Sequence, residues 1–589
     1  MKKIEERAEE QWKAVLGAEL VTGKQRLEYQ WSKLPEPWKD AFRDPLLKAV
    51  SIYFDFKAMQ GVKKDCVIDP KKILSSRFVL TNKGEEEWTK AILKARWVLG
   101  GHRDAEVGKY PTLAPTATLL SHNLLNLIAT LNGWAVYYED VSSAFLQGKP
   151  LPTEREVYVK LPGGYPSYVN EFILEMVGAG HRDDLLRLLK GGFGLAESPR
   201  LWYLEYRNTL KIIGLHELKL VPGMFRAFHP DGSLRAVVTI HVDDTRYTGD
   251  ATAQELWDEL HARLKFGALR KSTEGWTKFC GRWEKQCPSS FEFSYCMDEY
   301  IAKIPDLSEK ALKFTGEKLS DEVRTELSSL LGQISWAARQ GRHELLYGVS
   351  HCQQLMGLGE PDAIKYVQKL LVKAREKVEI KVKNLGCRFE EAIVVSASDP
   401  AYAAQPRAGS QGGVVCLLAH PDVLTKTAPV ALLEASSVRI NRVVRCSMSA
   451  ELSMAATAFE HGDFIRAVMA ELTLGRFRLS SWKWFSSTWK HYLVIDAKTG
   501  YDVLNSEGVT ADRKVMIDAA VLREAMMEEG SENYVRWMPG KEMISDGLTK
   551  WSGSGVLEHV MRTGQWSLAT LQKHKNSENQ LPNERECTI

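Results

Sequence analysis

The sequence predicts a protein of several domains, α+β in its first part and α/β with a mixed sheet in its last third. Its 589 residues correspond to roughly three to five domains at about 150 residues each. The composition, 44% hydrophobic and 26% charged, lies in the ordinary globular range. Strand and helix patterns alternate along the chain, and acidic residues follow several of the strands. A disordered chain, a fibre and a disulfide-stapled miniprotein are therefore excluded.

The overall charge of the chain provides little attraction for polyanions. Lysine and arginine number 78 against 75 aspartates and glutamates, a net charge of +3, so binding to nucleic acid has to come from local grooves. The start, MKKIEERAEEQW, lacks the apolar segment of a signal peptide, and no run of 18 apolar residues occurs. The nine cysteines are irregularly spaced, without a C-x-x-C pair. We therefore expect an intracellular protein with reduced thiols and no membrane contact.

Local patterns define the elements of the first part of the chain. Residues 1–70 are charged and helical in pattern. Next come strands at 76–82 (SRFVLTN) and 92–101 (ILKARWVLGG), a helix at 117–132 and a strand at 133–141 (GWAVYYEDV). The segment SLRAVVTIHVDDTRYTGD has β-branched residues on both sides of an Asp-Asp pair. It predicts a hairpin with carboxylates at its tip.

The second part begins with mixed short elements and ends in an alternation of strands and helices. Residues 251–385 alternate helices with short strands, and KVEIKVKNLGCRFEE marks a boundary. Beyond it we expect strands at 391–399, 412–420, 437–445 (SVRINRVVR), 491–496 and 533–540, and helices at 447–472, 514–530 and 541–550. The polar end of the chain is expected to fray.

Acidic residues at strand ends form a first candidate site. Asp140 ends GWAVYYED, and Asp243 and Asp244 follow 103 residues later in IHVDD. Carboxylates on rigid strand ends are able to hold two Mg²⁺ ions about 3.5–4 Å apart, the arrangement used in phosphoryl transfer. Taken alone, an Asp-Asp pair is more often an ordinary turn. The neighbouring motifs favour the metal site.

These motifs match a family. The runs WAVYYEDVSSAFLQG, EVYVKLPGGYP, LLKGGFGLAESPRLWY and IHVDDTRYTGD, in this order, resemble the reverse transcriptase of Ty/copia-type LTR retrotransposon Pol polyproteins. Upstream, LKARWVLGGHRD and YPTLAPTATLLSHNLLNLIATLNGW are similar to the family's fingers and first palm helix. The resemblance implies a right-hand polymerase of fingers, palm and thumb.

The resemblance implies roles for the carboxylates. Asp140 matches the family's first catalytic aspartate, and Asp243 and Asp244 match the pair of its YVDD-like motif. They would bind two Mg²⁺ ions, activate the primer 3′-hydroxyl and neutralise the triphosphate. Mn²⁺ is an alternative, because carboxylate sites accept both ions.

The same resemblance implies substrate-binding residues. Lys94 and Arg96 match a basic pair that contacts triphosphate oxygens, and Phe145 matches the aromatic ring under the incoming sugar. Arg200 lies in a block near the template, and His241 stands where the family usually has an aromatic residue beside the primer end. Ordinary alternatives are a solvated charge for Lys94 and a core position for Phe145.

A second acidic set lies in the last third of the chain. Asp399, Glu451, Asp496 and Asp546 are separated by 52, 45 and 50 residues. Asp399 and Asp496 end expected strands, Glu451 opens a helix and Asp546 sits in the last one. This order resembles RNase H, with GSQGG, SMSAELSM and VRWMPGKEMISDGLTK as landmarks. Each acid alone is explained as a cap or surface charge, whereas the four together favour a catalytic, two-metal nuclease site.

These inferences lead to a division into domains. We expect a helical extension, the fingers and palm, a thumb or connection region, an α/β RNase H-like domain with a mixed sheet, and a tail, at residues 1–70, 71–265, 266–388, 389–552 and 553–589.

The expected function is RNA-directed DNA polymerase with ribonuclease H, copying retrotransposon RNA into DNA. The partners implied are an RNA template, a DNA primer, the RNA/DNA hybrid, dNTPs and other parts of a Gag-Pol polyprotein. The implied location is the cytoplasm, in a virus-like particle, with the nucleus as an alternative. Two other hypotheses remain: a decayed or repurposed copy that binds nucleic acid without catalysis, and a nuclease whose polymerase half is a scaffold.

Overall fold

The computed structural model describes residues 28–82, 91–506, 513–528 and 530–569. The expectations for the first 27 residues and for the end of the tail lie outside these ranges. The chain divides into two compact units, which we describe separately. Unit 1 comprises residues up to Thr118, Tyr137–His229 and Arg235–Arg270, and unit 2 comprises Leu119–Val136, Pro230–Leu234 and the chain from Lys271 onward.

The first part of unit 1 packs helices against two small sheets. Its elements are α2 (Glu36–Ala41), α3 (Arg43–Asp55), α6 (Ser167–Val177), a sheet in the order β1-β7-β6-β2 (Met59–Lys63, His181–Leu188, Val157–Lys160, Ile73–Leu74), and the hairpin β3–β4 (Ser76–Asn82, Leu93–Leu99). The expectation that residues 1–70 are helical is wrong at β1. This strand forms through pairing with β7, more than 100 residues later, which no local pattern reveals.

The second part of unit 1 is an antiparallel sheet covered by helices. The strands are ordered β12-β5-β11-β10-β9-β8, and α5, α7 and α8 accompany them: β5 (Tyr137–Asp140), β8 (His216–Glu217), β9 (Met224–Phe228), β10 (Leu234–His241), β11 (Asp244–Gly249), β12 (Arg270–Lys271), α5 (Ala144–Gln147), α7 (Ser198–Ile212) and α8 (Gln254–Arg263). The amphipathic helix α7 buries Trp202, Tyr206 and Leu210 in the core under the sheet. The expected hairpin around the Asp-Asp pair is confirmed as β10–β11.

Unit 2 begins with helices and a small antiparallel sheet. The sheet order is β13-β14-β15-β16, with β13 (Thr277–Phe279), β14 (Arg282–Gln286), β15 (Phe293–Cys296), β16 (Ile380–Val382), α4 (Leu119–Asn132), α9 (Asp298–Ala302), α10 (Glu309–Leu312), α11 (Asp321–Arg339), α12 (Leu346–Leu358) and α13 (Asp362–Ala374). Ser320 caps the start of α11 by accepting from the Val323 N–H. Gly359 ends α12 in the left-handed conformation. The resulting α12–α13 hairpin packs on α11 around an apolar core.

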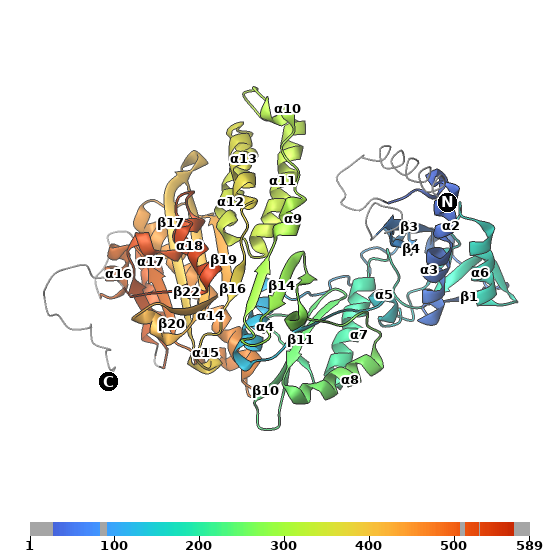
Figure 1. Cartoon of the computed structure of the whole chain (residues 1–589), viewed down its shortest axis with the longest axis horizontal. Helices are drawn as coiled ribbons and strands as arrows, with labels where there is room; N and C mark the ends of the chain where they lie inside the picture. The colour runs from blue at the N-terminus through green and yellow to red at the C-terminus, as the bar shows by residue number, and fades with distance from the viewer. Residues whose placement is uncertain (1–27, 83–90, 507–512, 529, 570–589) are drawn as a thin grey trace. The chain divides into compact units, whose positions relative to one another are not determined.

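The rest of unit 2 is a mixed sheet with helices (Figure 1). Its order is β21-β20-β17-β18-β19-β22, from β17 (Ile393–Gln405), β18 (Gly409–Ala419), β19 (Ala428–Arg439), β20 (His491–Ile495), β21 (Asn533–Trp537) and β22 (Gln565–Trp566), with α14 (Ser447–Thr473), α15 (Trp482–Ser486), α16 (Lys498–Leu504), α17 (Arg513–Met527) and α18 (Gly555–Thr563). Strands β17, β18 and β19 run antiparallel, whereas β20 and β21 join parallel to β17.

The third strand of this sheet differs from the expectation. SVRINRVVR at 437–445 was the expected strand, but β19 spans Ala428–Arg439. Within the apolar run APVALLEA, residues from Val430 onward pair with the buried strand β18, with one register shift between Cys416 and Leu417. Burial of this run determines the register, because a pairing shifted along the chain would place arginines against the buried strand.

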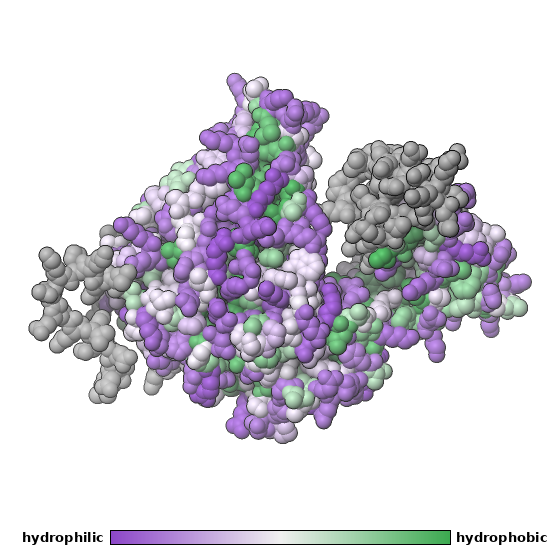
Figure 2. All heavy atoms as spheres, viewed as in Figure 1, coloured by the Kyte–Doolittle hydropathy of each residue, from purple (hydrophilic) through white to green (hydrophobic). Residues whose placement is uncertain are grey.

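The surface in Figure 2 is mostly hydrophilic, with apolar side chains gathered along the helices near α11. Exposed large apolar residues in these helices include Leu312, Trp336 and Val372. Within the described part of the chain, no helix combines the length and apolarity needed to cross a bilayer.

Candidate catalytic sites

The first acidic set lies at the tip of the β10–β11 hairpin in unit 1. His241 and Asp244 face each other as the last pair of the hairpin, so Val242 and Asp243 form a two-residue turn. On its other side β11 pairs with β5, and Asp244 lies directly opposite Asp140. The sheet therefore brings together two carboxylates that are 104 residues apart in the chain.

The turn that carries Asp243 is strained and firmly held. Val242 has φ +63°, a conformation that is costly for a β-branched residue. The buried indole of Trp202 donates from Nε1 to the carbonyl oxygen of Val242 at 2.7 Å, and the Val141 N–H donates to the carbonyl oxygen of Asp243 at 2.8 Å. Strain that persists under such restraint is typical of functional sites.

The electrostatics of this tip depend on burial and like charge. Asp140 and Asp243 are exposed and Asp244 is half-buried. Burial, followed by the negative charge of Asp243, raises the pKa of Asp244. Burial lowers the pKa of His241, which favours a neutral ring. The carboxylate oxygens of these three aspartates, all among the described residues, do not all lie within 4.8 Å of one another. The aspartates are brought near each other by the pairing of the strand backbones.

Glu139 supports the first site from behind and was not found from the sequence. Its side chain, in a residue only 3% exposed, accepts at Oε2 from the Tyr247 hydroxyl at 2.9 Å and lies 2.7 Å from Nε2 of His261. These contacts tie β5 to β11 and α8 beside Asp140. The available signal was a glutamate facing inward next to an exposed aspartate on one strand.

The glycine-containing motif LLKGGFGLAESPRLWY joins Phe145 to the β3–β4 hairpin. Gly194 has φ +93°, and a Cβ there would lie 2.2 Å from the carbonyl oxygen of Leu99 at the end of β4. The Leu99 N–H donates to the carbonyl oxygen of Phe193 at 2.7 Å. The ring of Phe193 lies 5.8 Å from that of Phe145, which is half-buried in α5. The glycines of this motif therefore allow its backbone to pass close to the end of β4. Phe193 of the motif in turn packs against Phe145, the residue predicted to contact the sugar.

The basic residues of unit 1 lie on two elements. Lys94 and Arg96 lie on one face of β4, while Ala95, Trp97 and Leu99 between and beyond them are buried. Arg200, on the first turn of α7, donates from Nη1 to the carbonyl oxygen of Leu113 at 3.2 Å. Their predicted roles toward triphosphate and template stay predictions.

The second acidic set converges in unit 2. Asp399 lies on β17, Asp496 directly follows β20, and Asp546 lies in the 3₁₀ helix Ile544–Leu548. Carboxylate oxygens of these three residues all lie within 4.8 Å of one another. Glu451, in the first turns of α14, lies close enough for the charges of Asp496 and Asp399 to act on it. The expectation that Asp399 ends its strand is wrong, because β17 continues to Gln405 in antiparallel pairing with β18.

This second group concentrates negative charge in a buried place. Burial, and next the charges of Asp496 and Asp399, raise the pKa of Glu451 to about 9. Burial also raises the pKa of Asp399 to about 6, with Thr549 opposing and Asp496 adding to the shift. Oε2 of Glu451 is buried and has no hydrogen-bond partner among the described residues. A dense set of carboxylate oxygens with an unpaired acceptor fits a hard cation such as Mg²⁺ or Mn²⁺.

Three residues of the second site were not found from the sequence. The Thr549 hydroxyl donates to Oδ2 of Asp399, and Lys550 forms an ion pair with Asp546. Gly413 lies opposite Asp399 in the β17–β18 register, and a Cβ there would lie 2.7 Å from Cβ of Leu548. The signals were the i, i+4 spacing of Asp546 and Lys550 and the GSQGG landmark.

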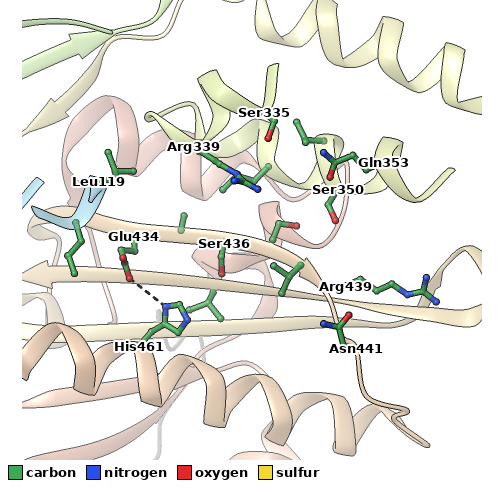
Figure 3. A pocket seen from close by; sticks show the side chains of 17 residues that line it. Leu119, Ser335, Arg339, Ser350, Gln353, Glu434, Ser436, Arg439, Asn441 and His461 are labelled. Carbon is green, nitrogen blue, oxygen red and sulfur yellow. Dashed lines mark ion pairs between the residues drawn. The ribbon is translucent and has the colours of Figure 1, made fainter. Parts of the chain in front are cut away.

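A pocket of about 600 Å³ lies beside β19 (Figure 3). Its polar lining comes from four elements: Ser335 and Arg339 of α11, Ser350 and Gln353 of α12, Ser436, Ser437 and Arg439 of β19, and His461 of α14. His461 pairs with Glu434 at 3.5 Å, and the hydrogen bond to this carboxylate raises the pKa of His461. The pocket is lined by both the α11–α12 helices and the mixed sheet.

Comparison with known proteins identifies a family for part of the chain. Residues 65–281 match the reverse transcriptase (RNA-dependent DNA polymerase) family. The matched region contains β4, α5, α7 and the β10–β11 hairpin, and therefore every residue of the first candidate site.

Relatives among curated proteins extend beyond this region. The chain is 25% identical over 419 residues to the retrovirus-related Pol polyprotein from transposon RE2 of Arabidopsis thaliana, covering 68% of this chain and 26% of the relative. It is 27% identical over 329 residues to the putative transposon Ty5-1 protein of Saccharomyces cerevisiae, covering 52% and 99%. The chain thus spans about a quarter of the length of the plant polyprotein.

A solved structure of a foamy viral protease-reverse transcriptase in complex with RNA/DNA hybrid is also similar. The TM-score is 0.39 at 12% identity, covering 88% of this chain and 55% of the other.

Proposed function

We propose that this chain, a relative of Ty/copia-type retrotransposon Pol polyproteins that contains a reverse transcriptase domain, is an RNA-directed DNA polymerase with a second, ribonuclease H site. The observation that carries the polymerase proposal is the register of Asp140 opposite Asp244 at a strained, braced hairpin inside the matched region. The nuclease proposal rests on the carboxylate group of unit 2.

In the proposed polymerase, each predicted residue has a physical task. Divalent metal ions held by carboxylates act as Lewis acids that activate the attacking oxygen and stabilise the leaving one. Asp140, Asp243 and Asp244 would hold them: Asp140 and Asp244 are paired on neighbouring strands, and Asp243 lies in the turn beside them. Lys94 and Arg96 would neutralise triphosphate oxygens of the dNTP, a task for which the planar fork of arginine is suited.

The ring of Phe145 would lie under the sugar of the dNTP and exclude a 2′-hydroxyl. The ring of Phe145 contacts the ring of Phe193, and the backbone carbonyl of Phe193 accepts a hydrogen bond from Leu99 at the end of β4. This contact holds the Phe145 ring in place. The RNA template and DNA primer would pass beside His241 and Arg200.

The proposed nuclease site belongs to a sheet of suitable topology. Three antiparallel strands continue into two parallel ones, and the acids come from the first strand, the helix after the third strand, the residue directly after the fourth strand and a final segment. This order supports an RNase H-like domain at 389–552. Asp399, Glu451, Asp496 and Asp546 would hold the metal ions, with Thr549 orienting Asp399 and Lys550 balancing the charge of Asp546. The substrate would be the RNA strand of an RNA/DNA hybrid.

The domain borders and the cellular setting are part of the proposal. Fingers and palm at 71–265 and a thumb or connection region at 266–388 would precede the nuclease. The chain would act beside other parts of a Gag-Pol polyprotein, in a cytoplasmic particle, copying retrotransposon RNA.

Primer extension on an RNA template with dNTPs and Mg²⁺ tests the polymerase. We expect the wild-type protein to extend the primer. The rate of Asp243→Asn/Asp244→Asn should fall at least about 100-fold, because the variant loses the carboxylates that would hold the metal ions stabilising the transition state. Asp231→Asn, in the loop between β9 and β10, is the control and should retain wild-type activity. Folded wild-type protein that extends no primer with Mg²⁺ or Mn²⁺ would support a non-catalytic copy instead.

A further inference from the structure

The segment that closes the proposed nuclease site is anchored to the helices α12 and α13 as well as to the mixed sheet. We call residues 544–551 the closing segment; it carries Asp546, Thr549 and Lys550 and ends at Trp551. Asp546 and Lys550 pair with each other, and Thr549 donates to Asp399. Its regular part is a 3₁₀ helix of five residues, Ile544–Leu548, a form with little intrinsic stability.

Trp551 inserts into the helix pair α12–α13. Its ring stacks on Tyr366 of α13, with centroids 5.5 Å apart and planes at 19°. Tyr347 and His351 of α12 meet the ring edge-on at 5.6 and 6.0 Å, and the Lys369 ammonium lies 4.7 Å from its centre. Offset and edge-to-face rings with a cation form a specific, well-packed socket.

A second anchor runs through Gln411, whose residue is fully buried on β18. Its amide oxygen accepts from Gln354 Nε2 of α12 at 3.0 Å, and its Nε2 donates to Ser350 of α12 at 3.0 Å and to Ser437 of β19 at 2.8 Å. The Ser437 hydroxyl in turn donates to the carbonyl oxygen of Leu548 at 2.5 Å. Ser350 and Ser437 also line the pocket of Figure 3.

The two anchors hold the closing segment on both sides of Thr549 and Lys550. Asp546 of this segment faces Asp399 and Asp496, and the three carboxylates, whose oxygens lie within 4.8 Å of one another, repel. A 3₁₀ helix of five residues alone resists that repulsion poorly. We propose that the helix pair α12–α13 positions the closing segment, with Trp551 and Gln411 as positioning residues, so that the nuclease site is completed by helices outside its own sheet. The proposal rests on the proposed nuclease function.

Two glycines of α12 provide a matched test away from the carboxylates. A Cβ on Gly348 would lie 2.5 Å from Cδ1 of Leu370 and 3.0 Å from Cη2 of Trp551, whereas a Cβ on Gly357 would meet nothing within 4 Å. Both positions are helical, so alanine favours the helix equally. Gly348→Ala therefore displaces the socket of Trp551, and Gly357→Ala is its control.

The measurements are cleavage of an RNA/DNA hybrid, primer extension, and hydrogen exchange of the closing segment without metal. We expect Gly348→Ala to lower kcat for cleavage at least about tenfold, since small displacements of catalytic groups are costly, with KM and primer extension unchanged. Exchange in residues 544–551 should be faster in Gly348→Ala than in Gly357→Ala. Trp551→Phe, which retains an aromatic ring, should cleave faster than Trp551→Ala, and Gln411→Glu should cleave more slowly than wild type.

Two outcomes overturn the proposal and differ in meaning. Equal cleavage and equal exchange in Gly348→Ala and Gly357→Ala would leave the nuclease in place and remove the positioning role of α12–α13. Wild-type protein that extends primers but cuts no hybrid with Mg²⁺ or Mn²⁺ would refute the proposed nuclease and the positioning role with it.

Discussion

Asp399 illustrates how the burial of a single acidic residue affects stability. Its residue is only 5% exposed, and burial, with the charges of Asp496 and Asp546 adding to it, raises its pKa from 3.8 to about 6. The folded state therefore binds a proton more tightly than the unfolded state does. This contribution to stability is present at low pH and is lost as pH rises from about 4 to about 6.

Asp399→Asn is accordingly expected to stabilise the metal-free protein while abolishing cleavage. At pH 8 in EDTA the free energy of unfolding should rise by up to about 3 kcal/mol, from a pKa shift of about two units, because asparagine still accepts from Thr549 and carries no charge. Thermal unfolding at pH 8 and pH 5 checks this expectation. The gain should shrink at pH 5, where Asp399 is protonated; an equal gain at both values would contradict the electrostatic explanation.

Two glycines permit close contacts between backbone segments that are distant in the sequence. Gly194 crosses Leu99 at a positive φ, and Gly413 allows the closing segment to lie directly on β18. The motif letters were visible in the sequence, but their reason is a close approach between distant segments. Only glycine permits such close backbone contacts, because it has no Cβ.

At the scale of elements, α14 packs on the mixed sheet through a glycine. A Cβ on Gly462 would lie 2.1 Å from Nε2 of His491 on β20, and this nitrogen lies 2.8 Å from the Ser396 hydroxyl of β17. Burial lowers the pKa of His491 to about 4, so the ring is neutral at neutral pH. The contact joins the helix that carries Glu451 to the strands that carry Asp399 and Asp496.

Gly462→Ala should therefore destabilise the mixed-sheet region. We expect a loss of about 1–3 kcal/mol from overpacking, in spite of the better helix propensity of alanine. Gly332→Ala in α11, where a Cβ would meet nothing within 4 Å, is the control and should be neutral or slightly stabilising. Urea unfolding followed by circular dichroism compares the two variants. Equal unfolding midpoints would show that α14 moves to accommodate the added methyl group with no loss of stability.

At the scale of the whole molecule, the two acidic sets belong to different compact units. Asp140, Asp243 and Asp244 lie in unit 1, and Asp399, Glu451, Asp496 and Asp546 lie in unit 2. Each unit has a hydrophobic core of its own, and neither carboxylate set needs a residue of the other for its local geometry.

The two proposed activities should consequently be separable. Asp243→Asn/Asp244→Asn is expected to cut an RNA/DNA hybrid at the wild-type rate, and Asp399→Asn to extend primers at the wild-type rate, because each substitution is nearly isosteric and lies in one unit. Both assays on both variants check this expectation. Loss of both activities in either variant would indicate that the sites are coupled.

The sequence by itself determined most local elements of this protein and the position of its candidate acidic residues. The Asp-Asp hairpin, the helix of Glu451 and the strands of Asp140 and Asp496 follow from short-range periodicity, which the backbone of each segment expresses locally. The order of motifs also identified the reverse transcriptase family, which the match to residues 65–281 confirms.

Only the tertiary structure decided which residues meet. Strand β1, the register of β19, the support of Glu139 and the anchors at Trp551 and Gln411 all depend on partners distant in the chain. A buried strand, acid or ring is stable in its place only once a distant segment supplies pairing, a hydrogen bond or a packed surface. Contacts between segments distant in the chain produce no periodic pattern in a single sequence, so they cannot be predicted from it. These contacts position the acidic residues that the sequence identified as candidates.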